Sequence, residues 1–335
     1  MNVKKAQSFI SNNAIYIVLV ILILGIAVYD PNFIAVSTLR DILIQSSTRI
    51  IIALGVAFIL ITAGTDLSAG RVVGLTAVIS ASMLQIPDYS RRFFPDLPQM
   101  WLIVPIVLAI LAGLICGLIN GLIVSKLNVP PFIATLGTMV IVYGVNSLYF
   151  DMEPNQSQPI GGLRKDFTDL GSGFIGSGQY SIPYIVLIAL GVAAIVWVVF
   201  NKTKLGKNMY AIGGNIQAAK VSGINVSKNL IYIYAIAGSL YGLAGVLEAA
   251  RTGGATNNYG NMYELDAIAA CVVGGVSTTG GIGTVPGVLV GVIIFTIINY
   301  GLTFIGISPY WQLIIKGLII VAAVAFDMRK YSAKR

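Results

Sequence analysis

The sequence contains no histidine, only two cysteines and few charged side chains. Asp, Glu, Lys and Arg together make up 10% of its 335 residues, whereas a soluble globular domain carries roughly 25%. Hydrophobic residues make up 56%, and the mean hydropathy is +0.86. So little charge could not cover the surface of a water-soluble fold of this size. Much of the chain is therefore predicted to lie in lipid.

The missing residue types and motifs also exclude most kinds of catalytic site. Without histidine the chain lacks the commonest general base and a common zinc ligand. Cys116 and Cys271 each lie within an apolar run, which indicates neither a disulfide framework nor a metal cluster. Gly206-Lys207 is followed by Asn208 and lacks the preceding glycine of a phosphate-binding loop, so the chain is not an ATPase. We expect no catalytic residue, no metal and no cofactor in this chain.

Apolar runs of membrane-spanning length recur along the whole sequence. A helix needs about 20 residues to cross the hydrocarbon core of a bilayer. The sequence therefore predicts an all-α polytopic membrane protein, a single domain over residues 1–335 with about ten transmembrane helices, some of them short or broken. The expected spans are 14–29, 42–63, 71–86, 101–124, 132–150, 182–200, 229–250, 264–280, 285–305 and 310–326.

The distribution of basic residues predicts the orientation of the chain. The segment 201–228 contains five lysines and no acidic residue, and loops on the cytoplasmic side carry such an excess. If this segment is a cytoplasmic loop, ten crossings place both termini in the cytoplasm. The segment 151–181, which is rich in Gly, Ser, Asp and Gln, then becomes the long loop on the outer side, where water can solvate it.

A first polar string, Gly64–Arg71, interrupts two apolar runs. It contains Asp66 and Ser68, and a charged side chain near the middle of a bilayer costs roughly 2.5 to 3.5 kcal/mol. Asp66 is therefore expected to face protein or water. Capping of the helix that begins near Gly70, by Asp66 or Ser68, is favoured over direct contact with a solute.

A second polar string begins with Glu264 and Asp266 and continues into the glycines and hydroxyls of residues 274–284. Non-helical backbone at membrane depth is tolerated only where protein or a water-filled cavity satisfies its polar groups. A short or broken helix lining a pathway is thus expected here. For Glu264 and Asp266, interaction with a helix dipole is favoured over substrate binding.

Three asparagines inside apolar runs complete the set of candidate pathway residues. Asn120, Asn146 and Asn299 could bind the hydroxyl groups of a sugar, although hydrogen bonding between helices is the favoured role. Asn120 precedes Pro130, and Asn299 precedes Pro309, by ten residues each, so an internal duplication is an open alternative. The candidate translocation path consists of Asp66, Ser68, Asn120, Asn146, Glu264, Asp266 and Asn299.

Four longer segments carry a resemblance to a known family. They are the Ala211–Ile224 stretch AIGGNIQAAKVSGI, the string GTDLSAGR over Gly64–Arg71, the stretch Tyr263–Gly287, and Val129–Thr138 with the sequence VPPFIATLGT. Together they resemble permease subunits of bacterial ABC importers for simple sugars, and the resemblance extends over nearly the whole chain. It implies a location in the bacterial inner membrane and transport of a monosaccharide, with galactose or methyl galactoside as the expected solute.

The resemblance also implies partners. It predicts a homodimer of permeases in the lipid bilayer with the translocation path at the dimer interface, a cytoplasmic ATP-binding protein that binds ATP and magnesium, and a periplasmic sugar-binding protein; no nucleic acid is expected. A short cytoplasmic helix within 201–228 would dock in a cleft of the ATPase, with Ala218 and Ala219 as a slim face between bracketing glycines. An ion-coupled secondary sugar transporter remains the alternative. The predicted coupling residues are Gly213, Gly214, Asn215, Ala218, Ala219, Ser222 and Gly223.

Overall fold

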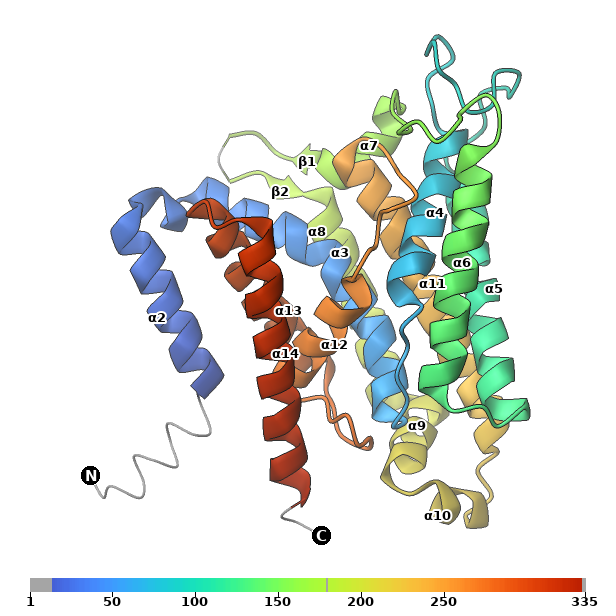
Figure 1. Ribbon diagram of the computed structural model, residues 1–335, viewed down its shortest axis with the longest axis vertical. Coiled ribbons are helices and arrows are strands. Elements are labelled where there is room, and N and C mark those ends of the chain that lie inside the picture. Colours follow the sequence, from blue (N-terminus) through green and yellow to red (C-terminus); the bar gives the residue numbers. More distant parts are fainter. Residues whose placement is uncertain (1–13, 179, 333–335) are drawn as a thin grey trace.

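The computed structural model describes residues 14–178 and 180–332, and almost all of its ordered elements are helices (Figure 1). The short strands β1 (Phe174–Ile175) and β2 (Ile182–Pro183) form one antiparallel pair. The helices are α2 (Ala14–Tyr29), the 3-10 helix η1 (Pro31–Ile34), α3 (Val36–Ile61), α4 (Ala69–Met83), α5 (Ile103–Lys126), α6 (Pro131–Asp151), α7 (Lys165–Ser172), α8 (Tyr184–Lys202), α9 (Lys204–Gly214), α10 (Ile216–Val221), α11 (Val226–Thr252), α12 (Tyr263–Val273), α13 (Val285–Phe304) and α14 (Pro309–Ser332).

The prediction of an all-α membrane protein is confirmed, but the count of ten spans is not. Among the described residues, six helices are long and apolar enough to cross a membrane: α3, α5, α6, α8, α11 and α13. Shorter apolar helices occupy Leu19–Tyr29, Ala69–Met83 and Pro309–Ala322. In the expected span at 264–280 the only helix is α12, which has 11 residues and ends at Val273. This span is a short helix followed by non-helical backbone, as the glycines and hydroxyls after Val273 indicated.

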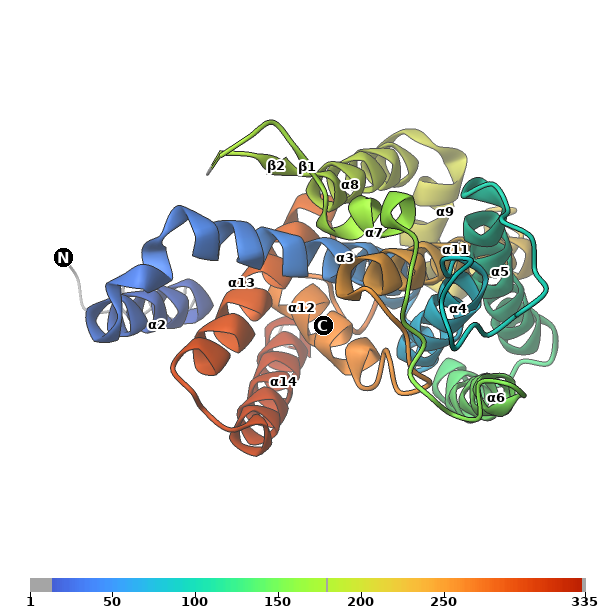
Figure 2. The same cartoon turned by 90° about the horizontal axis from the view of Figure 1, so that it is seen from above.

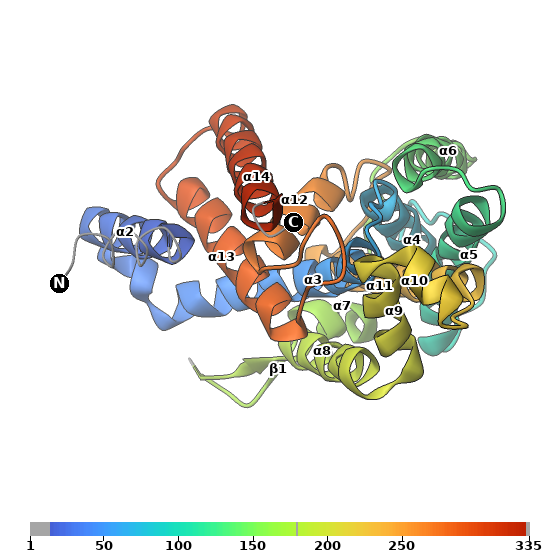
Figure 3. The same ribbon diagram turned by 90° about the horizontal axis from the view of Figure 1, so that it is seen from below.

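Helices α3 and α11 form the buried core of the bundle, and the outer helices surround them. Seen along the bundle, α3 and α11 lie in the middle, α5 and α6 on one side, and α13, α14 and α2 on the other (Figures 2 and 3). Most residues of α3 and α11 are buried, whereas α5, α6 and α8 expose many leucine, isoleucine and valine side chains. An apolar surface of this extent fits lipid and not water.

Glycines four residues apart allow α5 to lie directly against α11. A Cβ atom added at Gly113 would meet the carbonyl oxygen of Gly238, and one added at Gly117 would meet that of Tyr234. Gly242 approaches the backbone of Ile110 in the same way. The glycine spacing therefore marks close helix packing, which drives association of helices in lipid.

The two ends of the bundle carry the two segments on which the predicted orientation depends. Helices α9 and α10 lie at one end, together with the start of α2 and the end of α14, whereas α7, β1 and β2 lie at the opposite end (Figure 1). This arrangement agrees with the prediction that residues 201–228 lie on one side of the membrane and residues 151–181 on the other. The chain termini themselves lie outside the described residues, so their cytoplasmic location stays a prediction.

Single cysteines at Lys204 and Lys165 test this orientation. We expect Lys204→Cys, in α9, to react only from the cytoplasm, and Lys165→Cys, in α7, only from the periplasm, because a membrane-impermeant maleimide reaches one side. The measurement is labelling of intact cells and of inverted vesicles. Cys116 and Cys271 are buried and add little background. Labelling of Lys204→Cys in intact cells would reverse the predicted orientation.

Two groups of four helices share the same order of elements. In the first, α3 is followed by a non-helical segment, the short helix α4, and then α5 and α6. In the second, α11 is followed by a non-helical segment, the short helix α12, and then α13 and α14. Proline opens the last helix of each group, at Pro131 and Pro309. An internal duplication remains a prediction, which this common order supports.

Candidate functional site

The first interruption of the membrane-spanning helices is the segment 62–68 between α3 and α4. Asp66 is buried, and its Oδ1 accepts hydrogen bonds from the backbone N–H of Ser68 (2.8 Å) and from the Ser68 hydroxyl (2.6 Å). Ser68 is the residue that precedes α4, but its side chain caps no helix N–H group. The predicted cap by Ser68 is therefore wrong. Asp66 instead fixes the turn that leads into α4, because its carboxylate engages Ser68 on both backbone and side chain.

Asn120 joins this turn to the neighbouring helix α5. Its Nδ2 donates a hydrogen bond to Ser68 Oγ (2.9 Å), and the backbone N–H of Leu67 donates to Thr135 Oγ1 in α6 (3.1 Å). Asp66, Ser68 and Asn120 each expose about 1% of their surface. Three of the predicted pathway residues thus form one buried polar cluster, the Asp66 cluster. The hydrogen bonds given above for this cluster all join protein groups. Asn120 thus bonds a neighbouring part of the bundle, in line with the role that was favoured for it.

Removing the carboxylate tests what the Asp66 cluster contributes. We expect Asp66→Ala to lower the unfolding temperature of the purified protein, since hydrogen bonds to a charged group contribute about 1.5 to 3 kcal/mol. Asp66→Asn keeps an oxygen that can accept from Ser68 and should retain more of the stability. The measurement is thermal unfolding in detergent, with uptake measured in parallel. Wild-type stability with reduced uptake would instead place Asp66 in contact with the solute.

The second interruption is the non-helical segment 253–262, which runs from the end of α11 to the start of α12 and lies against α4 (Figure 1). Its backbone touches that of α4. A Cβ atom added at Gly70 would meet the carbonyl oxygen of Gly260, one added at Gly260 would meet that of Gly70, and one added at Gly74 would meet that of Tyr259. Only glycine allows this contact, because any side chain would separate the two backbones.

Polar side chains of α4 and α6 hold the segment in place. Arg71 donates a hydrogen bond from Nη2 to Asn261 Oδ1 (2.7 Å). Asn146 Nδ2 donates to the carbonyl oxygen of Asn257 (3.3 Å), whose own Nδ2 donates to Ser147 Oγ (3.3 Å). The predicted interhelical role of Asn146 is therefore replaced by a bond to this non-helical backbone.

Several polar groups of the segment remain exposed, Asn258 and Asn261 among them. Exposed non-helical backbone inside a membrane protein requires water or another protein surface, since lipid cannot satisfy it. This surface and the part of Arg71 in it were not predicted from the sequence. The run Thr256–Asn261, with three asparagines between two apolar runs, was the signal that could have found it.

Glu264 lies where the first turns of α4 and α12 meet. It occupies the first turn of α12, as predicted, and exposes 7% of its surface. Its Oε2 lies beside Gly70 of α4 and has no hydrogen-bond partner among the described residues. The N-terminal ends of two helices, each with a partial positive charge, thus surround one buried carboxyl group.

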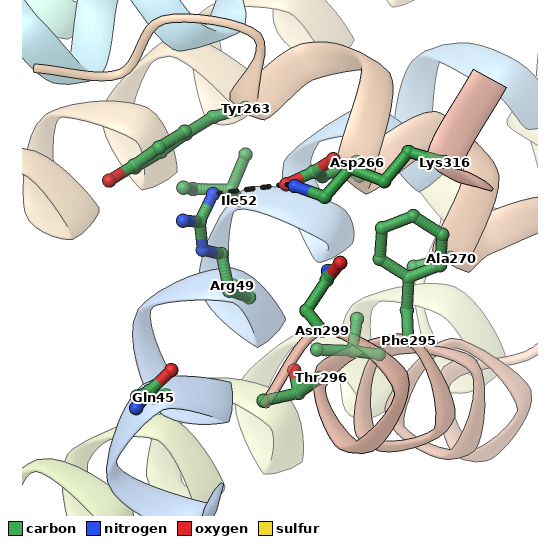
Figure 4. Close-up of a pocket in the computed structure, with 12 residues that line it drawn as sticks. Gln45, Arg49, Ile52, Tyr263, Asp266, Ala270, Phe295, Thr296, Asn299 and Lys316 are labelled. Atoms are coloured by element: carbon green, nitrogen blue, oxygen red, sulfur yellow. Dashed lines mark hydrogen bonds and ion pairs between the residues drawn. The ribbon is translucent and has the colours of Figure 1, made fainter. Parts of the chain in front are cut away.

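Asp266 and Asn299 lie in a separate place, a cavity between α3, α12, α13 and α14. Asp266 Oδ2 accepts a hydrogen bond from Lys316 Nζ (3.1 Å) and forms an ion pair with Arg49 Nη1 (3.7 Å; Figure 4). Asn299 lines the same cavity. The seven predicted residues therefore fall into three groups: the Asp66 cluster, the contact region of Asn146 and Glu264 around α4, and this cavity. The two cations that pair with Asp266 were not predicted.

The predicted coupling segment forms the helices α9 and α10. Asn215 caps α10, since its Oδ1 accepts hydrogen bonds from the N–H groups of Gln217 and Ala218 (3.0 Å each). Ala219 is 3% exposed and packs against Ile212 and Val226. The expectation that Ala219 offers a docking face is wrong, because α10 turns this side chain toward α9 and α11.

The glycines of the coupling segment also differ in their surroundings. Gly213 faces inward, and a Cβ atom added there would meet the carbonyl oxygen of Ile61 and the N–H of Gly281. Gly214 and Gly223 have open space around them, and Ala218 and Ser222 are exposed. A role of this segment in coupling stays a prediction, with its exposed surface on Gly214, Asn215, Ala218, Ser222 and Gly223.

Comparison with known proteins relates this architecture to import permeases. Residues 38–324 match the family described as the permease component of branched-chain amino acid transport systems. The galactose/methyl galactoside import permease protein MglC of Escherichia coli (strain K12) is 54% identical over 335 residues, 100% of this chain and 99% of that protein. The protein of the same name from Haemophilus influenzae is 56% identical over 331 residues, 99% of this chain and 98% of that protein. The ribose import permease protein RbsC of Escherichia coli (strain K12) is 36% identical over 317 residues, 94% and 92% of the two chains. No solved structure matches the chain significantly.

Proposed function

We propose that this chain, which belongs to the permease-component family matched over residues 38–324, imports galactose or methyl galactoside as the membrane subunit of an ATP-driven importer. The observation that carries the solute assignment is the 54 to 56% identity to two import permeases for these sugars, over nearly the whole length of both chains. The relatives are import permeases by name, and the ion-coupled alternative finds no support among them.

The proposed path follows the non-helical segment 253–262. Its exposed asparagines supply donors and acceptors in a bundle whose outer helices expose mainly apolar side chains. Sugar hydroxyls can exchange their hydrogen bonds with water for bonds to such groups. In a homodimer, this segment would face its counterpart across the path, which would keep lipid away from its polar groups.

The proposed docking site for the ATP-binding protein is the exposed side of α10. Contacts of α9 explain how a movement there could reach the end of α3 and the non-helical backbone after α12. Gly213 packs against Ile61 and Gly281, whose N–H donates to the Ile61 carbonyl oxygen (2.8 Å). Tyr210 donates from its hydroxyl to the carbonyl oxygen of Gly283 (2.8 Å). A displacement of α9 would therefore act on the end of α3 and on the segment that follows α12.

Reconstitution tests this function. The permease, its ATP-binding protein and the periplasmic binding protein are placed in proteoliposomes, and uptake of radiolabelled galactose is measured with and without ATP. We expect uptake that requires ATP and the binding protein and that persists when ion gradients are dissipated. Uptake by the permease alone, driven by an ion gradient, would refute the proposal.

A further inference from the structure

The loops that follow α4 and α6 are bonded to each other at the end of the bundle where α7 lies (Figure 1). We call residues 84–100 and 152–164 the two-loop cap. The backbone N–H of Ile86, in the first loop, donates a hydrogen bond to the carbonyl oxygen of Gly162 in the second (2.8 Å). Backbone pairing of this kind holds two loops in a fixed register.

The buried side chain of Gln85 strengthens the connection between the two loops. Its Nε2 donates to the carbonyl oxygen of Gly161 in the second loop (2.8 Å), and its Oε1 accepts from the N–H of Phe93 in the first (2.6 Å). Separating the loops would leave a buried amide without its partners, which is unfavourable. The two-loop cap therefore behaves as a single body.

A backbone bridge ties the cap to the segment 253–262. The N–H of Ile160 donates to the carbonyl oxygen of Ala255, and the N–H of Ala255 donates to that of Ile160 (2.9 Å each). Both residues are buried, in an apolar cluster that includes Phe150 and Phe167. Because buried backbone groups seldom remain unpaired, we expect this bridge to stay closed when the cap moves.

The same segment is held at its other end by α4. Arg71 bonds Asn261, and the backbone of Gly260 lies against that of Gly70. The segment thus runs from the cap, which reaches it at Ala255, to the first turn of α4. A displacement of the cap would act on the residues beside Ala255, and the segment would carry it toward α4.

The exposed surface of the cap suits a protein partner. A hollow of about 360 Å³ is lined by both loops, with Pro87, Tyr89 and Pro95 from the first and Pro154 from the second. Proline side chains lose almost no conformational freedom on burial, so this surface is ordered in advance of binding. The charged residues that line the hollow, Arg91 and Arg92, are both cationic, which favours a partner with an acidic surface.

We propose that the periplasmic sugar-binding protein docks on the two-loop cap and that the bridge between Ile160 and Ala255 transmits this docking to the segment 253–262. The proposal rests on the proposed function, in which the segment lines the path, and on the predicted outer location of the cap. Gly254 is a positioning residue of the bridge, because an added Cβ atom would meet the Ile160 carbonyl oxygen and separate the two backbones.

Gly254→Ala tests this link in the reconstituted complex with the ATP-binding protein. We expect wild-type affinity for the sugar-loaded binding protein, but stimulation of ATP hydrolysis by it should fall by about fivefold or more, the lower end of coupling between two sites. Loaded binding protein should alter deuterium exchange of 253–262 in the wild type and not in this variant. The control is Gly191→Ala in α8, where an added Cβ atom has no neighbour within 4 Å. Wild-type stimulation of the Gly254→Ala complex, or stimulation lost together with binding, would overturn the proposal.

A disulfide in place of the bridge tests the same link without loosening the fold. Ile160 and Ala255 are directly opposite each other in a hydrogen-bonded pair, in which the Cα atoms lie about 5.5 Å apart, a distance that a disulfide can span. We expect the double variant Ile160→Cys with Ala255→Cys to keep its stimulation after oxidation, because cap and segment move together. Stimulation that disappears on oxidation and returns on reduction would show that the bridge must open, and would refute the proposal.

Arg91→Glu tests the docking surface itself. Reversing this exposed charge at the hollow should weaken binding of the sugar-loaded binding protein by about fivefold, which corresponds to one exposed ion pair. Unchanged affinity would show that the binding protein docks elsewhere.

The outcomes also separate this link from the proposed function. If the wild-type and Gly254→Ala complexes take up galactose and respond to the binding protein equally, the link is refuted and the function stands. If the binding protein stimulates ATP hydrolysis in the wild type but not in Gly254→Ala, and neither complex takes up galactose, the link stands and the assigned solute falls.

Discussion

Replacing Gly70 by valine is expected to destabilise the protein by about 3 kcal/mol or more and to remove most of the sugar uptake. Overpacking of a well-packed interior costs typically about 1 to 3 kcal/mol, and at Gly70 one of the two neighbours is backbone, which cannot turn aside as a flexible side chain can. An added Cβ atom would meet the backbone carbonyl oxygen of Gly260 as well as Glu264 Oε2. To relieve the clash, the non-helical segment 253–262 would have to move away from α4. This movement would break the bond from Arg71 to Asn261.

The matched control is Gly137→Val. Gly137 also lies in a helix of the bundle, α6, but an added Cβ atom there has no neighbour within 4 Å. We expect its folded yield, unfolding temperature and uptake to remain near those of the wild type. The measurements are monodisperse yield after size exclusion, thermal unfolding and ATP-dependent galactose uptake. A Gly70→Val protein with wild-type uptake would contradict the role given to the contact between Gly70 and Gly260.

The helices themselves could be predicted closely because lipid imposes a uniform requirement on them. A segment surrounded by lipid must be apolar on every side, so its limits follow from composition alone. The expected span 132–150 became Pro131–Asp151, and 285–305 became Val285–Phe304. Interruptions follow from the same rule. Glycines and hydroxyls after Val273 excluded a lipid-facing helix, and α12 ends there.

The site could be predicted only in part, because its contacts join residues that no local pattern connects. Asp66 and Ser68 are two positions apart, and their interaction is local in sequence. Asp266 instead pairs with Arg49 and Lys316, which belong to two other helices. A hydropathy profile shows that a lysine within a span is unusual, but it does not show which acidic residue pairs with that lysine. The non-helical segment 253–262 was missed for a related reason. A polar run between two apolar runs is compatible both with an exposed loop and with a loop that re-enters the bundle.

Burial also changes which residues of the coupling segment can be tested. Small size suggested Ala219 as a docking residue, but its side chain contacts Ile212 and Val226. A tryptophan at Ala219 would therefore disturb the packing of α10 on α9 and α11 before it met any partner. Loss of the ATP-binding protein from such a variant would not distinguish a blocked surface from a misfolded one. The side of α10 that faces away from α9 and α11 is the informative one.

Val221→Glu is expected to prevent the ATP-binding protein from remaining bound to the permease. Val221 ends α10 and is 91% exposed at the end of the bundle where the lysine-rich segment lies. Fully burying a valine contributes about 1.5 to 3 kcal/mol, so a charged group in its place should weaken association by roughly 10- to 150-fold. Fold and stability should not change, because the side chain has almost no contact within the chain. The measurement is copurification of the ATP-binding protein, with ATP hydrolysis stimulated by sugar-loaded binding protein as a second readout.

Ile175→Glu is the control for this substitution, since it introduces the same charge at a half-exposed apolar residue of β1, at the opposite end of the bundle. We expect this variant to retain the ATP-binding protein. Val221→Asn provides an intermediate, because it removes the apolar contact without adding a charge, and it should weaken association less than Val221→Glu. If the Val221→Glu permease retained the ATP-binding protein as firmly as the wild type, α10 would not be the docking site. The exposed surface of the α5–α6 connection, where Leu127 is 70% exposed, would then be the next candidate at this end of the bundle.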